Sequence, residues 1–193
     1  MKNNRLNIII AVGLILMAGV ARIVNHEMHL YNFAPVCALG LFSGAIIKDK
    51  RIALLLPILA QLMGDVYISL FTQWKGFYGV EQVCVYASLL LVTLMGSAMG
   101  QPKALKVLGF TLGSAVVFFA LSNFGTWLSL QYFGKADLYN YGTGFKGFVN
   151  TYVAAIPFFK NTLIGECCGG ILLFGAYYLL QQAVARKAVT AKA

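Results

Sequence analysis

Two carboxylic acids, Asp65 and Glu166, lie inside long apolar segments of the sequence. An ionisable side chain at membrane depth is costly, so it is by default a candidate for ligand binding, ion pairing or proton transfer. Each acid could pair with Arg22, with Lys160 or with a cationic group of a substrate. Each could equally form a buried structural hydrogen bond, and the sequence leaves the two interpretations open.

A second polar group precedes the apolar segment at residues 33–47. This segment is too short to cross a hydrocarbon core of ~30 Å, so its helix is expected to begin below the outer surface. Asn32 can cap the helix and Pro35 suits its first turn. The helix N-terminus would then present N–H groups to a cavity. Just before it lie Arg22, Asn25, His26 and His29. This is the first candidate binding site, and an outer loop resting on lipid headgroups is the alternative.

His26 and His29, with Glu27 between them, raise the question of a metal site. Two imidazoles without a third convergent ligand are a weak signal for a metal. The four cysteines all lie in apolar segments and lack the spacing of a zinc site or a secreted disulfide framework. We therefore expect neither a metal nor a cofactor.

The segment at residues 105–130 ends with Ser-Asn-Phe-Gly-Thr-Trp at 122–127. Asn123 offers an uncharged donor and acceptor, and Trp127 offers a flat stacking surface. Tyr and Phe residues are frequent in the connection that follows, residues 131–156. They are expected to form either an interfacial belt or a lid over a ring-shaped ligand.

Six apolar segments must position these residues: 6–24, 33–47, 52–71, 82–99, 105–130 and 157–180. The chain has 193 residues, of which 60% are hydrophobic and 11% charged, which is too much apolar surface for a soluble domain. Continuous apolar runs without alternation favour helices over a barrel. The sequence predicts an all-α integral membrane protein with six transmembrane helices in a single domain, residues 1–193.

The basic residues orient these helices. Ten of the fifteen Lys and Arg residues lie in alternate gaps between the segments, and the other gaps hold five. Because the more basic gaps face the cytoplasm, both termini are predicted to be cytoplasmic in a multi-pass protein. Asp65 then lies in the outer half of its helix and Glu166 near the middle. The first segment has 19 residues, long for a signal-peptide core, so we expect it to be retained.

Several functional classes lack their sequence signals. The net charge of +9 is scattered over short gaps, which favours contact with anionic lipid over nucleic-acid binding. There is no phosphate-binding G-x-x-x-x-G-K-[ST], so the chain is not expected to hydrolyse nucleotides. No nucleophile, His and acid converge at a readable spacing, and no paired interrupted helices indicate a self-sufficient transporter. We expect a protein that is not an enzyme.

Three stretches of the chain carry a resemblance to a known family. They are residues 22–35, ending His-x-x-Asn-Phe-x-Pro; residues 122–128, Ser-Asn-Phe-Gly-Thr-Trp-Leu; and residues 155–166, Ala-Ile-Pro-Phe-Phe-Lys-Asn-Thr-Leu-Ile-Gly-Glu. Together they resemble an uncharacterised bacterial family of membrane transport proteins of about this length. That family is similar to the S component, the substrate-binding subunit, of energy-coupling-factor (ECF) vitamin transporters.

The resemblance implies an S-component-like bundle of six helices in the bacterial inner membrane. It implies capture of a vitamin-like small molecule on the outer side, and docking on a membrane coupling subunit driven by two ATPase subunits. The chain departs from the pattern where Leu30 and Tyr31 replace expected prolines, and where the first helix lacks Ala-x-x-x-Ala. The substrate-binding candidates, with Asp65 added to those carried over by the motifs, are Arg22, His29, Asn32, Phe33, Asp65, Asn123, Trp127, Asn161 and Glu166.

Two other functional classes remain open. A structural or assembly protein, similar to a cell-shape factor, would bind no substrate and would need no outer cavity. An integral membrane enzyme would need two titratable groups within reach of one pocket. Wide separation of Asp65, Glu166 and His29 would count against an enzyme.

Overall fold

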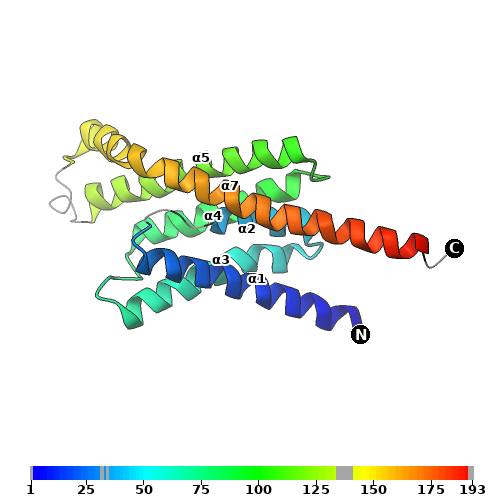
Figure 1. The fold of residues 1–193 in the computed structure, drawn as a ribbon. Helices are drawn as coiled ribbons and strands as arrows, with labels where there is room; N and C mark the ends of the chain where they lie inside the picture. Colours follow the sequence, from blue (N-terminus) through cyan, green and yellow to red (C-terminus); the bar gives the residue numbers. More distant parts are fainter. Residues whose placement is uncertain (1, 31–32, 34, 134–140, 191–193) are drawn as a thin grey trace.

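The computed structural model describes the backbone of residues 2–30, 33, 35–133 and 141–190, with side chains from Gly13 to Ala183 and at Arg186. These residues form six α-helices and no strand, which confirms the prediction of an all-helical fold (Figure 1). The helices are α1 (Lys2–Glu27), α2 (Val36–Ile46), α3 (Lys50–Phe71), α4 (Val80–Ala98), α5 (Ala104–Tyr132) and α7 (Gly144–Thr190).

Four helices among the described residues are long and apolar enough to cross a membrane. They are α3, α4, α5 and the part of α7 that runs from Gly144 to Ala183. Large apolar side chains cover the outside of the bundle: Leu105, Ile171 and Phe71 are 82%, 76% and 72% exposed. A soluble monomer rarely shows so continuous an apolar surface. The chain therefore has the character of an integral membrane protein.

Helix α2 is the centre of the bundle. It has only 11 residues and contacts all five other helices. Every residue from Val36 to Gly44 is buried. The sequence predicted a short helix at residues 33–47, and the structure makes it shorter still, because a central helix of about 16 Å is covered at its sides by longer ones. The predicted ends of the first, third, fourth and fifth helices agree with the structure to within a few residues at each end.

Glycines bring α2 and α4 into backbone contact. A methyl group added at Gly44 would overlap the carbonyl of Thr93, and one added at Gly96 would overlap the carbonyl of Leu41. Small residues at such positions let membrane helices pack closely enough for dispersion contacts to hold them together. The α2–α4 interface therefore depends on the absence of side chains at these two positions.

Replacement of Gly44 by Ala is expected to destabilise the protein by about 1–3 kcal/mol, since the added methyl forces the two backbones apart. Gly109 on α5 is the matched control, because nothing lies within 4 Å of a methyl group added there. Gly109→Ala should leave stability unchanged or raise it slightly, because Ala is the better helix former. The midpoint of thermal unfolding in detergent measures both variants. Equal midpoints would contradict the close α2–α4 contact.

Helix α7 differs most from the sequence prediction. It has 47 residues, whereas the last helix was placed at 157–180 with a loop before it. That prediction was wrong for residues 144–156, which are helical. The apolar run begins at Pro157, but this proline lies inside the helix with its side chain exposed. Phe145, Phe148 and Tyr152 have the i, i+3, i+7 spacing of one helix face, and that spacing was the overlooked signal.

The helices run alternately along the bundle, so that α1 begins and α7 ends at the same end (Figure 1). The turns after α2 and α4 lie at this end as well, whereas the loop after α3 lies at the opposite end, towards which the C-terminal end of α1 points. The connections at the end of the bundle that holds the termini are therefore short turns. The longer connections gather at the other.

Candidate functional site

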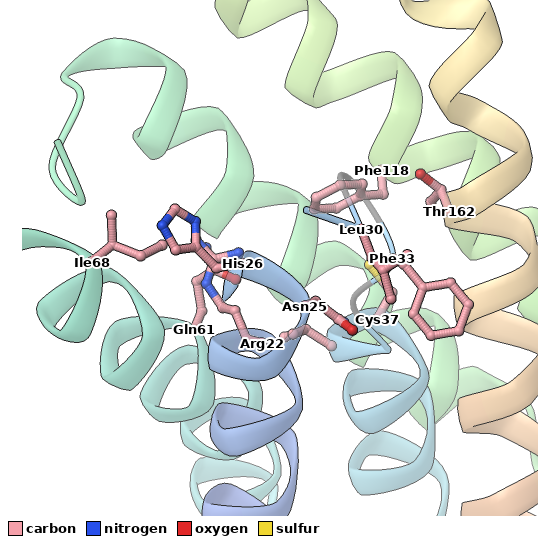
Figure 2. Close-up of a pocket in the computed structure, with 11 residues that line it drawn as sticks. Arg22, Asn25, His26, Leu30, Phe33, Cys37, Gln61, Ile68, Phe118 and Thr162 are labelled. Carbon is pink, nitrogen blue, oxygen red and sulfur yellow. The ribbon is translucent and has the colours of Figure 1, made fainter. Parts of the chain in front are cut away.

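A cavity of about 210 Å³ lies beside the C-terminal end of α1 (Figure 2). It is bounded by the last turns of α1, the residues that lead into α2, the second half of α3, and one side chain each from α5 and α7. The lining residues are Arg22, Asn25, His26, Leu30, Phe33, Val36, Cys37, Gln61, Ile68, Phe118 and Thr162. Five helices thus contribute to one small site.

The polar side of the cavity is backed by a buried carboxylate, Asp65, which is fully shielded from solvent. Arg22 forms an ion pair with Asp65 Oδ1. Gln61 Nε2 donates to the same oxygen at 3.2 Å, and Gln82 Nε2 and Tyr86 Oη donate to Oδ2 at 2.8 and 2.9 Å. Four side chains from three helices therefore satisfy one carboxylate. Such a network joins α1, α3 and α4 through one buried acceptor group.

Two i, i+4 pairs explain how the sequence builds this network. Gln61 and Asp65 lie one turn apart on α3, and Gln82 and Tyr86 lie one turn apart on α4. Gly64 lets the Arg22 side chain lie against α3, because a methyl group there would overlap it. The network is thus placed by helix periodicity together with one small residue.

Tyr78, in the loop between α3 and α4, extends the network. Burial and the nearby Asp65 carboxylate together raise the pKa of its phenol to about 12, against the opposing effect of Arg22. The phenol therefore keeps its proton at any physiological pH. It adds a neutral hydroxyl group to the surroundings of the ion pair.

Two buried polar atoms of cavity-lining residues have no hydrogen-bond partner among the described residues: Arg22 Nε and Asn25 Nδ2. The two residues lie three apart on α1, so they share one face of the helix. An unpaired buried donor costs about 1–3 kcal/mol. Native structures seldom leave such groups without water or a ligand. The cavity lining therefore has unused hydrogen-bonding capacity, and both of these buried atoms are N–H donors.

The opposite side of the cavity is apolar. Phe33 precedes α2, Phe118 lies on α5 and Leu30 follows α1 (Figure 2). Rings and aliphatic side chains facing a few oriented polar groups are the usual composition of a small-molecule site. The sequence predicted Arg22 and Phe33 as substrate-binding residues, and both line this cavity.

Glu166 lies beneath the cavity floor and is 1% exposed. Its Oε1 accepts the backbone N–H of Cys37 at 3.2 Å, at the start of α2. Gly169 lets α7 approach closely, because a methyl group there would overlap Pro35. A carboxylate at a helix N-terminus is favoured by the helix dipole and by the unpaired N–H groups of the first turn. Glu166 thus acts as an N-terminal cap supplied by another helix.

The start of the second helix differs from the sequence prediction, which began it at residue 33 with Asn32 as the cap. The N-cap residue is Pro35, which makes no side-chain cap hydrogen bond, and Asn32 lies outside the described residues. The sequence suggested that the free N–H groups of this terminus would face a ligand. In the structure the N–H of Cys37 donates to Glu166 instead, because α7 packs against α2. The positive end of α2 is therefore already matched by a carboxylate of the protein.

Asn123 and Trp127 lie apart from the cavity. Asn123 Nδ2 donates to the Phe119 carbonyl at 2.7 Å, one turn back on α5, and Trp127 Nε1 donates to the Gly144 carbonyl at 3.1 Å. The indole also packs edge-on against Phe148, with ring centroids 5.5 Å apart. The contacts of Trp127, with others among the aromatic rings, hold the start of α7 against the end of α5, whereas the bond of Asn123 stays within α5.

The remaining predicted residues are dispersed. His29 is exposed, follows α1 and has a positive φ of 55°, and Asn161 is half-buried on α7; neither lines the cavity. Within the described ranges, no group of three His, Cys, Asp or Glu residues is arranged to hold a metal ion.

A larger groove of about 580 Å³ lies between α5 and α7, near the end of the bundle that holds the termini. Its walls include Val107, Leu108, Ile171 and Phe174, and Lys103 is the charged residue among those that line it. The groove is larger than the cavity, but its lining is mostly apolar. Small-molecule sites are distinguished by a few converging polar groups, so the smaller cavity is the better candidate.

A family model matches residues 2–189, which is nearly the whole chain, and describes a family of unknown function, DUF6580. The chain belongs to this family. No curated protein and no solved structure matches it. For this DUF6580 member no activity can be carried over from a relative, and the function has to be argued from the cavity.

Sequence reasoning missed several residues that shape the site of this DUF6580 member. Gln61, Ile68, Phe118 and Thr162 line the cavity and were not singled out. Gln61 carried a usable signal, since an amide four residues before a buried acid lies on the same helix face. The other three have the side chains of ordinary core residues, and only the packing of α3, α5 and α7 brings them together.

Proposed function

We propose that this DUF6580 member is a six-span protein of the bacterial inner membrane that captures a small molecule from the outer side. Both termini would lie in the cytoplasm, in agreement with the ten basic residues in one set of gaps. The four long apolar helices and the apolar surface of the bundle support insertion in a membrane. The cavity would then open towards the outer face, away from the termini.

The observation that carries the proposal is the cavity itself. It combines aromatic walls with two buried, unpaired N–H donors, Arg22 Nε and Asn25 Nδ2. Structural proteins gain nothing from donors left unpaired at such a cost. A ligand that accepts from them would remove that cost on binding. The same feature argues against a purely structural or assembly role.

Capture rather than catalysis is proposed because both oxygens of Asp65, the carboxylate that pairs with the lining residue Arg22, already have partners. Asp65 accepts from four side chains, and Glu166 accepts from the N–H of Cys37. A general acid or base needs a titratable group within hydrogen-bond reach of the reacting atoms. Among the lining residues, His26 is the one ordinary acid–base side chain, and it has no carboxylate partner shown beside it.

Energy for release into the cell would come from other subunits. The resemblance to the S components of ECF transporters supports a membrane coupling subunit and two ATPase subunits as partners. The chain has no phosphate-binding motif of its own. A vitamin-like molecule is the substrate class that this resemblance suggests.

The proposal is tested by mass spectrometry of small molecules released when the purified, detergent-solubilised protein is denatured. We expect one compound in stoichiometric amount from the wild type. Leu30→Trp should release none, because Leu30 lines the cavity and the larger ring would fill it. Met28→Trp is the matched control: Met28 is 63% exposed two residues away and does not line the cavity.

Two results would count against capture. One is a well-folded wild type that releases no compound, which would favour the structural role. The other is equal release from the Leu30→Trp and Met28→Trp variants, which would place the bound compound elsewhere.

A further inference from the structure

We infer that the cavity recognises an uncharged ring compound through a carbonyl-type acceptor, and not through an anionic or cationic group. This inference rests on the proposed function and specifies the chemistry of its ligand. It follows from the kind of atoms left unpaired, from the balance of charge around them, and from the walls of the cavity.

The unpaired atoms of the cavity indicate whether the ligand must donate or accept hydrogen bonds. Arg22 Nε and Asn25 Nδ2 are both donors, and they lie on one face of α1. An ammonium group or any other donor would leave them unsatisfied and would add unpaired donors of its own. A carbonyl oxygen has two lone pairs and can accept from two N–H groups at once. The recognised group is therefore an acceptor.

The charge balance argues against an anion. The guanidinium of Arg22 is already neutralised by Asp65. The acids Glu27 and Glu81 lie nearby: Tyr67 donates to Glu27 at 3.2 Å, and the charge of Glu81 acts on the neighbouring Tyr78. A ligand carboxylate would thus lie beside a positive charge that Asp65 already neutralises, which makes its burial costly.

The positive end of α2 does not change this balance. Glu166 already accepts the N–H of Cys37, so the helix terminus carries its own acidic partner. His26 also lines the cavity, and in its neutral form one ring nitrogen donates and the other accepts. An uncharged acceptor fits the donors without disturbing any of these groups.

The walls favour a flat and small molecule. Phe33 and Phe118 present rings to the cavity, and aromatic side chains prefer to pack on other rings. The volume of about 210 Å³ is below the ~300–1,000 Å³ of typical ligand pockets. The ring system that enters is therefore expected to be a single ring or a small fused one.

Benzamide and benzoate are a suitable pair of probes, because they share a ring and differ in charge at the acceptor group. Their dissociation constants for the full-length protein in detergent can be measured by saturation-transfer NMR, after bound compounds have been exchanged out. We expect benzamide to bind at least tenfold more tightly than benzoate. Preference for benzoate, equal binding of both probes, or binding of neither would overturn the inference.

Asn25→Asp tests the donor directly, because it replaces the amide N–H₂ by a carboxylate oxygen of nearly the same shape. We expect benzamide to bind about tenfold more weakly, which corresponds to the loss of one hydrogen bond. Glu27→Gln is the control on the same helix, since Glu27 is exposed and does not line the cavity. Unchanged binding in Asn25→Asp, with a thermal midpoint near that of the wild type, would contradict a role for this donor.

The two proposals fail in different ways. If the wild type releases an anionic compound on denaturation, or prefers benzoate, capture stands and the inference about an uncharged acceptor is overturned. If the wild type releases nothing and binds neither probe, the proposed function itself is overturned. Release of a neutral ring compound together with weakened benzamide binding in Asn25→Asp supports both.

Discussion

Asp65→Asn is expected to lower the free energy of unfolding by about 3 kcal/mol or more, since it breaks a buried ion pair and leaves a charge without its partner. The new amide would also turn a donor towards Gln82 and Tyr86, which donate to Oδ2 of the native carboxylate. Two donors would then face each other at 2.8–2.9 Å distances that suit a donor and an acceptor. Unfolding in a graded series of sodium dodecyl sulfate measures the loss.

Two further variants test whether the loss of stability comes from the buried ion pair between Arg22 and Asp65. Glu27→Gln is the same acid-to-amide change at an exposed position of the same polar region, and it should cost little. Arg22→Met combined with Asp65→Asn removes both charges and should recover a large part of the loss, because no unpaired charge remains. If the double variant is as unstable as the sum of the two single ones, the ion pair does not hold α1 to α3.

The second large effect is expected at Glu166. Glu166→Leu removes the acceptor of the Cys37 N–H, and the loss should be about 1–3 kcal/mol from the buried donor left unpaired. Glu166→Gln keeps an oxygen in place and should cost clearly less. Hydrogen exchange at the first amides of α2, followed by mass spectrometry, should speed up strongly in Glu166→Leu and slightly in Glu166→Gln.

The start of α2 is also part of the cavity wall, through Val36 and Cys37. Glu166→Leu should therefore weaken ligand binding even though Glu166 does not line the cavity. If Glu166→Gln were as damaging as Glu166→Leu, the hydrogen bond would not be the contribution that matters, and the capping role proposed for this carboxylate would be contradicted.

The fold was largely predictable, because in a membrane the helix is the element that satisfies its own backbone, so apolar run lengths map onto helices. The prediction failed where this rule does not apply. Residues 144–156 are helical with few continuous apolar residues, and their signal was ring spacing rather than hydropathy. The first turn of α2 was misplaced because its cap comes from Glu166, 129 positions away in the sequence from Cys37.

The site was less predictable than the fold. Arg22 and Asp65 each stood out as a charge in an apolar setting, but their pairing needs α1 and α3 to lie side by side. Asn123 and Trp127 stood out equally well, but Asn123 bonds to a carbonyl of its own helix and Trp127 serves the contact between α5 and α7. A polar residue in an apolar run reveals that it must have a partner. It does not reveal whether that partner is a ligand or the protein itself.

The length of α7 has a structural consequence. Its 47 residues extend for about 70 Å at 1.5 Å per residue, more than twice the ~30 Å thickness of the hydrocarbon core. Even at a tilt of about 40°, the upper end of the usual range, roughly 30 Å of the helix must stand outside that core. The start of α7 is held by rings on α5, and the helix continues along the bundle to the end that holds the termini (Figure 1). A single helix thus joins the aromatic contacts at one end of the bundle to the basic residues Arg186 and Lys187 at the other.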